Sequence, residues 1–125
     1  MTSSTLTKVE LRASLTPLIH QGLEAARHAP SEEAWQHLER AHILSQPFPG
    51  LHVKVHVRML GRAFRDRKWR EFFGQLPRLL LAGPGSFFGR YPLGNRGTTV
   101  ISMFQPEPLP SDLASLLSEE RKDAR

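Results

Sequence analysis

The sequence predicts an all-α protein with four main helices in antiparallel hairpins, an extended C-terminal segment and a short terminal helix. Three observations support this prediction. Apolar residues recur every three to four positions through most of the chain, and prolines, glycines and capping residues divide it at short intervals. The one segment that alternates like a strand has no neighbouring strand with which to pair. Because 125 residues suffice for one core, we expect residues 1–125 to form a single helical domain.

The first helix is expected near residues 6–28. At about 100° per residue, one side of this helix collects the apolar positions Leu11, Leu15, Leu18, Ile19, Gly22 and Ala26. Pro17 lies on the opposite, outward side, where a bend toward the core is tolerated. The pattern is therefore that of an amphipathic helix.

The second helix is expected to begin at Ser31, as the N-cap, and to end near Gln46. Its apolar arc holds Ala34, Leu38, Ala41 and Ser45. His42 faces inward beside this arc, with Glu39 and Gln46 at its flanks, whereas His37, Gln36 and Arg40 point away. The following QPFPGL segment ends the helix, since its prolines and glycine cannot propagate it.

Residues 51–65 fit two patterns. Leu51, Val53, Val55, Val57 and Met59 alternate with polar residues, as in a strand. Read as a helix, the stretch places Val53, Val57, Leu60 and Phe64 on the buried side and Lys54, Arg58, Arg62 and Arg65 on the exposed side. We favour the helix because its period continues past Gly61, where the alternation fails, although Leu51 and Val55 fit it badly.

A fourth helix is expected between Asp66 and about Ala82, kinked at Pro77. Its predicted buried face carries Trp69, Phe72, Phe73, Leu76, Leu79 and Leu80. Turn-forming residues follow, and an extended segment leads to a terminal helix that Ser111 caps and that carries Leu113, Leu116 and Leu117. Residues 118–125 are expected to be a frayed tail.

Composition excludes several classes of function. The chain has no cysteine, which excludes disulfides and thiolate metal sites. No apolar run approaches about 18 residues and the N-terminus has no export signal, so we expect a cytoplasmic protein. The net charge is +5, which permits nucleic-acid contact without requiring it. In the arginine-rich stretch 58–70, the helical wheel buries the interleaved aromatic residues Phe64 and Trp69, so we interpret a solvated face. Nucleic acid ranks third as a partner, after a metal ion and a protein.

No enzyme signature is present. The HExxH string of zinc proteases is absent, and a di-iron bundle needs two Glu-x-x-His pairs where this chain has only Glu39 with His42. The segment Gly94–Gly97 lacks the longer phosphate-loop string, so we interpret it as a turn. Catalysis is not indicated.

Histidine is the residue type on which a site could be built. In an antiparallel hairpin across residues 46–51, His42 and His56 lie at similar distances from the connecting turn along the helix axes. His52 lies one helical turn nearer to it. With Glu39 they form a candidate metal site of three imidazoles and one carboxylate, which Arg40 and Gln46 would orient from behind. This ligand set suits zinc, nickel, cupric copper or iron.

Four segments resemble a family of small bacterial proteins of unknown function: HLERAHILSQ at 37–46, HVKVHVRML at 52–60, FGQLPRLL at 73–80 and PLGNRGTTVIS at 92–102. The resemblance spans about residues 34–113. It implies a compact, cytoplasmic, stand-alone helical protein without an assigned activity. It also implies a pattern centred on Glu39, Arg40, His42, Gln46, His52 and His56 and on a glycine-asparagine turn, whose third residue is Arg96 here where the family more usually has a small one.

Two functions follow as hypotheses. The first is a non-enzymatic protein that binds a metal or small ligand between the second and third helices and buffers or delivers it. The alternative is a tetratricopeptide-like helical module that binds another protein, in which the histidines are only buried polar structure.

Overall fold

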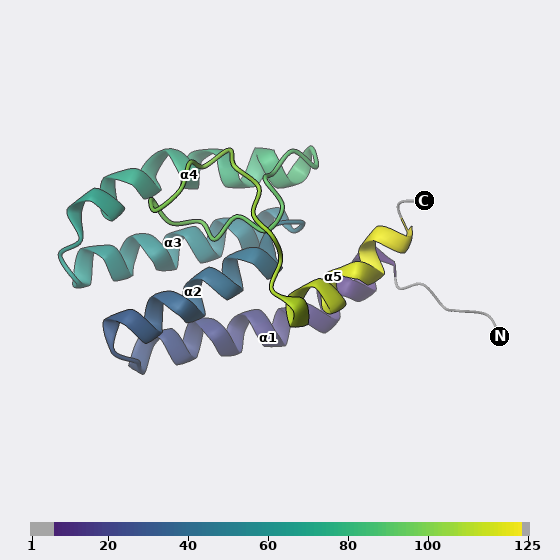
Figure 1. Cartoon of the computed structure of the whole chain (residues 1–125), viewed down its shortest axis with the longest axis horizontal. Helices are drawn as coiled ribbons and strands as arrows, with labels where there is room; N and C mark the ends of the chain where they lie inside the picture. The colour runs from purple at the N-terminus through teal and green to yellow at the C-terminus, as the bar shows by residue number, and fades with distance from the viewer. Residues whose placement is uncertain (1–6, 124–125) are drawn as a thin grey trace.

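The computed structural model describes residues 7–123, which form five helices and no strand (Figure 1). The all-α prediction is confirmed. The helices are α1 (Lys8–His28), α2 (Ser31–Ser45), α3 (Pro49–Arg65), α4 (Trp69–Phe87) and α5 (Ser111–Asp123). Helices α1 to α4 pack in chain order, each against the next, and α5 contacts α1 and α2 (Figure 1). The tail expected at 118–125 lies partly outside the described residues, and the backbone of α5 continues as helix to Asp123.

Helix starts follow local hydrogen bonds. Thr7 caps α1, because its Oγ1 accepts from the amide of Glu10 and its own amide donates to the Glu10 carboxylate. Ser31 was expected to cap α2, but that prediction is wrong: the cap is Pro30, and the Ser31 hydroxyl donates instead to Asp66, 2.7 Å away. This contact ties the start of α2 to the end of α3.

The core lies among α1, α2 and α3. It comprises apolar side chains from these three helices and from α5, including Leu11, Leu15, Ile19, Leu38, Val55, Met59 and Leu113. The helix predicted over 51–65 is present as α3, but its predicted buried side is wrong. Leu51 and Val55 are buried, whereas Val57 and Phe64 are exposed. The buried side differs from the predicted one because α3 packs against both α2 and α4. It therefore also buries polar residues, whose partners lie on neighbouring segments.

Arg62 is one such residue. It was predicted on the exposed side of α3, yet only 9% of it is exposed. Its Nε donates to Asp66 at 2.9 Å, and its two terminal nitrogens donate to the carbonyls of Ala26 and Ala29. These carbonyls stand at the end of α1, so Arg62 joins α1 to α3.

The buried face of α4 is opposite to the predicted one, and the helix extends beyond Ala82 to Phe87. Its buried residues are Glu71, Gln75, Ala82 and Ser86. The predicted buried row is exposed or only partly buried, with Phe73 63% and Leu80 77% exposed. The polar row faces inward because its side chains hydrogen-bond to α3 and to the segment that follows α4.

Residues 88–110 contain neither helix nor strand and lie across α2, α3 and α4 before reaching α5 (Figure 1). Side chains of Gln46, Glu71 and Gln75 hold this segment through its backbone. Among the described residues, no helix combines the length and apolarity that a bilayer span requires. Phe64 and Trp69, which the sequence predicts as buried, are exposed. Their burial therefore gives no argument against a nucleic-acid partner, and the low rank of that partner stays a prediction.

Candidate metal centre

Three histidine side chains meet between α2, α3 and α4. His42 comes from α2, and His52 and His56 come from successive turns of α3; all three are buried. Their Nε2 atoms form a small triangle, with 3.0 Å from His42 to each of the others and 3.2 Å between His52 and His56. The sequence-based expectation that these three residues converge is therefore confirmed.

The other ring nitrogen of each histidine has a partner. The Nδ1 of His42 lies 2.7 Å from the backbone oxygen of Asn95. The Nδ1 of His52 lies 2.7 Å from the hydroxyl of Ser86, and the Nδ1 of His56 lies 2.6 Å from the amide oxygen of Gln75. A backbone oxygen can only accept, so the Nδ1 of His42 carries the proton.

The Gln75 amide has only one orientation that satisfies its neighbours. Its Nε2 donates to a Glu71 carboxylate oxygen at 2.8 Å and to the Gly97 backbone oxygen at 2.7 Å, both of which are acceptors. Its Oε1 therefore faces His56 and accepts from the ring. The result is a chain from carboxylate to amide to imidazole.

Ser86 fixes His52 in the same way. Its hydroxyl hydrogen is donated to the backbone oxygen of Gln46, so its oxygen accepts from the Nδ1 of His52. All three rings then carry their proton on Nδ1. Each Nε2 consequently directs a lone pair at the other two.

Burial keeps the three rings neutral. Burial is the largest cause for each, and it lowers the pKa of His52 to about 3, that of His56 to about 4 and that of His42 well below its ordinary value. Three uncharged lone-pair donors at such short separations repel one another unless an electrophile lies between them. This is the donor arrangement that a metal cation requires.

The dimensions of the triangle fit a transition metal. For nitrogens 3.0–3.2 Å apart, an ion about 2.1 Å from each would have nitrogen–metal–nitrogen angles of roughly 90–100°. His42, His52 and His56 would hold such an ion through three ligand atoms and would leave its other positions to further ligands. A cavity of about 200 Å³ adjoins the histidines, lined also by Arg78, Leu81, Tyr91, Met103 and Phe104.

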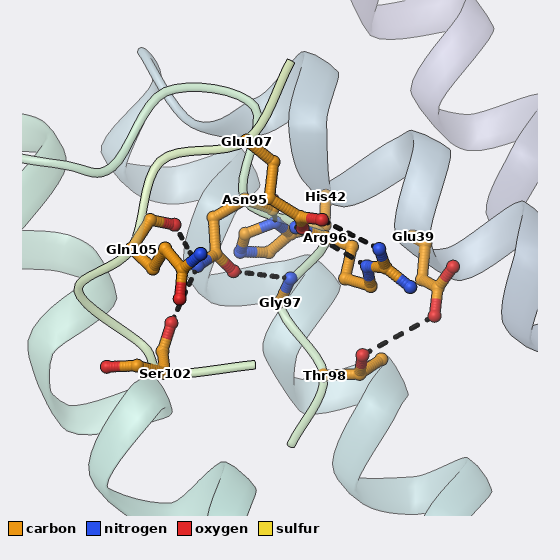
Figure 2. Close-up of polar contacts among 9 residues, drawn as sticks. All are labelled: Glu39, His42, Asn95, Arg96, Gly97, Thr98, Ser102, Gln105 and Glu107. Carbon is orange, nitrogen blue, oxygen red and sulfur yellow. Dashed lines mark hydrogen bonds and ion pairs between the residues drawn. The ribbon is translucent and has the colours of Figure 1, made fainter. Parts of the chain in front are cut away.

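The Gly94–Gly97 turn encloses His42 (Figure 2). Asn95 anchors it, since its side-chain nitrogen donates to the backbone oxygens of Ser102 and Gln105 and its Oδ1 accepts from the amide of Gly97. Gly97 has φ +85°, and a Cβ there would lie 2.6 Å from the His42 ring. Only glycine fits both the backbone conformation and the contact.

The remaining predicted site residues lie elsewhere. Glu39 is not part of the group of three; its carboxylate accepts from the Thr98 hydroxyl at 3.4 Å, beside the Arg96–Glu107 ion pair (Figure 2). Arg40 pairs with Asp112 at the start of α5. Gln46 holds the turn, by accepting from the Gly94 amide and donating to the Pro92 oxygen.

Sequence reasoning missed Glu71, Gln75, Ser86 and Asn95, the residues that orient the rings or support those that do. One signal was available. Glu71, Gln75, Ala82 and Ser86 recur at helical spacing on the face opposite the aromatic row. Asn95 had one signal, its place in the glycine-asparagine turn of the family pattern, but that pattern assigned it no role.

The model of one protein family, described as a protein of unknown function (DUF3703), matches residues 10–117. The chain belongs to this family. The match covers all residues of the histidine triangle and of the groups that hold it. No curated protein and no solved structure matches the chain.

Proposed function

We propose that this DUF3703 protein binds one divalent transition-metal ion through the Nε2 atoms of His42, His52 and His56. The observation that carries the proposal is the fixed tautomer of all three rings, which directs three lone pairs at one point. In a cluster held by hydrogen bonds between the rings, the N–H of one imidazole would donate to a nitrogen of the next. Here every ring proton is used outside the triangle.

Nitrogen-only ligation restricts the metal. Neutral imidazoles suit zinc, nickel, cupric copper and ferrous iron, and suit the harder magnesium and calcium poorly. Glu39 is not needed as a ligand in this proposal, because water or another small molecule can complete the coordination from the cavity. The corresponding role is metal handling in the cytoplasm, by buffering or delivery, without catalysis.

Metal analysis of protein purified without an affinity tag tests the proposal, followed by titration of the apoprotein with zinc and nickel. We expect one equivalent of metal, which the double variant His52→Ala and His56→Ala no longer binds. The matched control replaces the exposed histidines, His20→Ala with His28→Ala, and should bind as the original protein does. Absence of saturable binding, or equal binding by both double variants, would contradict the proposal.

A second candidate function rests on a different observation. The exposed row of α4, defined as Phe73, Leu76, Leu80 and Leu81, is an apolar surface of the kind that contacts other proteins. In this candidate the protein is a helical interaction module and the histidines are structural. It predicts that Phe73→Ser with Leu80→Ser abolishes binding to the partner, whereas chelator and His52→Ala do not.

A further inference from the structure

The cavity beside the histidine triangle contains positive charge and no carboxylate. Its lining includes Arg78 from α4 and Arg90 from the following segment, and none of its described lining residues is acidic. Glu71 lies behind this lining, where it is linked to His56 through the Gln75 amide and its negative charge acts on both His56 and Arg78. The charged side chains that line the cavity itself are all cationic.

A bound metal makes this imbalance larger. Three neutral imidazoles would leave a divalent ion with its full charge of two, and Arg78 lines the same cavity. Concentrated positive charge in a buried site is unfavourable unless an anion compensates it. All three histidines line this cavity, so an anion in it would lie beside a metal that they held.

Arg78, which lines the cavity, has one donor without a partner. Its terminal nitrogens donate to the backbone oxygens of Gly74 and Ile101, at 2.8 and 3.0 Å. Its Nε is the one buried side-chain nitrogen or oxygen without a hydrogen-bond partner among the described residues. Buried donors of this kind are rare in proteins and cost free energy when they stay unpaired.

Arg90 provides a second charge. It is exposed and, within residues 7–123, its side chain forms no ion pair. The rest of the lining is largely apolar and includes Leu81, Met103 and Phe104. An inorganic oxyanion would leave these side chains without a partner, whereas the hydrocarbon part of an organic acid would cover them.

We infer that the metal-loaded protein binds a small organic carboxylate in this cavity. One carboxylate oxygen binds the metal, Arg78 and Arg90 compensate the charge, and the hydrocarbon body packs on Leu81, Met103 and Phe104. The carboxylate would take the coordination position of a water, which leaves to solvent, and no covalent bond of the acid is made or broken. The inference rests on the proposed metal site and adds the class of ligand that the site takes.

Cobalt-loaded protein tests this inference, because the visible bands of Co²⁺ change when a coordination position is taken by a new ligand. The probes are acetate, butyrate and sulfate. We expect saturable spectral changes with both carboxylates. Butyrate should bind roughly tenfold more tightly than acetate, since each buried methylene contributes about 0.8 kcal/mol, and sulfate should bind least.

Two variants test what Arg78 and Arg90 each contribute to carboxylate binding. Arg90→Gln removes a charge without removing an ion pair, and we expect it to weaken butyrate binding several-fold with unchanged cobalt stoichiometry. Arg78→Lys keeps a charge but removes the Nε donor, and we expect about a tenfold loss, as for a charge-assisted hydrogen bond. Arg70→Gln, an exposed arginine of α4 outside the cavity lining, is the matched control and should bind butyrate normally.

The outcomes separate the inference from the proposed function. One equivalent of cobalt with no spectral response to either carboxylate would overturn the carboxylate site and leave the metal site intact. Tighter binding of sulfate than of butyrate would overturn the organic-acid assignment. Failure to bind cobalt at all would overturn the metal site and the inference together. If Arg78→Lys loses the fold, Arg90→Gln and the order of the three anions still decide the result.

Discussion

The amide oxygen of Gln75 lies 2.6 Å from the Nδ1 of His56 and accepts a hydrogen bond from it. This contact links the histidine triangle to Glu71 and to the Gly97 carbonyl, because the same amide donates to both. It therefore fixes the tautomer of a ring on α3 and holds the turn that covers His42. Groups that orient a metal ligand in this way commonly contribute 10–100-fold in metal affinity.

We predict that Gln75→Leu weakens zinc binding by about 10–100-fold. The substitution removes the acceptor for His56 and leaves Glu71 and the Gly97 oxygen with one donor fewer each, so the unfolding free energy should also fall by about 1–3 kcal/mol. Competition with a chromophoric chelator measures the affinity, and urea unfolding measures the stability. Gln36→Leu, an exposed glutamine on α2, should change neither. Zinc affinity equal to that of the original protein would show that Gln75 does not orient the ring.

Gly97→Ala should destabilise the protein by about 1–3 kcal/mol. A Cβ at this position meets the His42 ring at 2.6 Å, and φ of +85° is unfavourable for alanine. The matched control is Gly61→Ala in α3, where nothing lies within 4 Å of the added Cβ. That change should stabilise the helix by about 0.5–1 kcal/mol. Urea unfolding of both variants checks the pair, and a neutral Gly97→Ala would mean that the turn does not press on His42.

Asp66 makes stability depend on pH. Partial burial alone would raise the pKa of Asp66, but hydrogen bonds from Arg62 and Ser31 outweigh it and hold the pKa below its ordinary range. A carboxyl whose folded-state pKa is lowered stabilises the fold above its unfolded-state pKa, and the stabilisation is lost as pH falls through the folded-state pKa.

Asp66→Asn should therefore cost about 2 kcal/mol of unfolding free energy at pH 7, since Arg62 loses a buried ionic partner. The difference from the original protein should shrink as the pH falls below about 4. Urea unfolding at pH 7 and pH 3 measures both values. A difference that is the same at the two pH values would indicate that the ion pair does not contribute.

Helical period and a short connecting turn were together enough to predict that His42, His52 and His56 converge. His52 and His56 are one turn apart, and a short turn after α2 places His42 opposite them. The same reasoning could not place Glu39. It lies three residues before His42, which is close to one turn, but its carboxylate reaches Thr98 in a segment whose course the sequence did not reveal.

Helical period also failed to decide which side of α4 faces inward. This helix carries an aromatic row and a polar row with the same spacing, and hydrophobicity favoured the aromatic one. The polar row is buried because Gln75 and Ser86 pair with histidines of α3, and Glu71 pairs with Thr99. Such pairings join residues far apart in sequence. Helix propensity and hydrophobic periodicity describe one helix at a time, so they cannot predict pairings between segments.

The depressed pKa values of the triangle predict zinc binding that persists in mild acid. Ligand protonation competes with the metal, and at pH 5 three histidines of ordinary pKa would each lower the apparent affinity by more than tenfold. With the pKa of His52 at about 3 and that of His56 at about 4, protons compete little until the pH approaches 4.

We therefore expect the zinc dissociation constant at pH 5 to lie within about tenfold of its value at pH 7. Chelator competition at both pH values measures the dissociation constant, with circular dichroism to establish that the apoprotein is folded at each. The variant His20→Ala with His28→Ala should behave identically, because those rings are exposed and lie outside the triangle. A loss of a thousandfold or more in folded protein would mean that the three rings titrate as solvated histidines do, contrary to the burial and hydrogen bonding of the triangle.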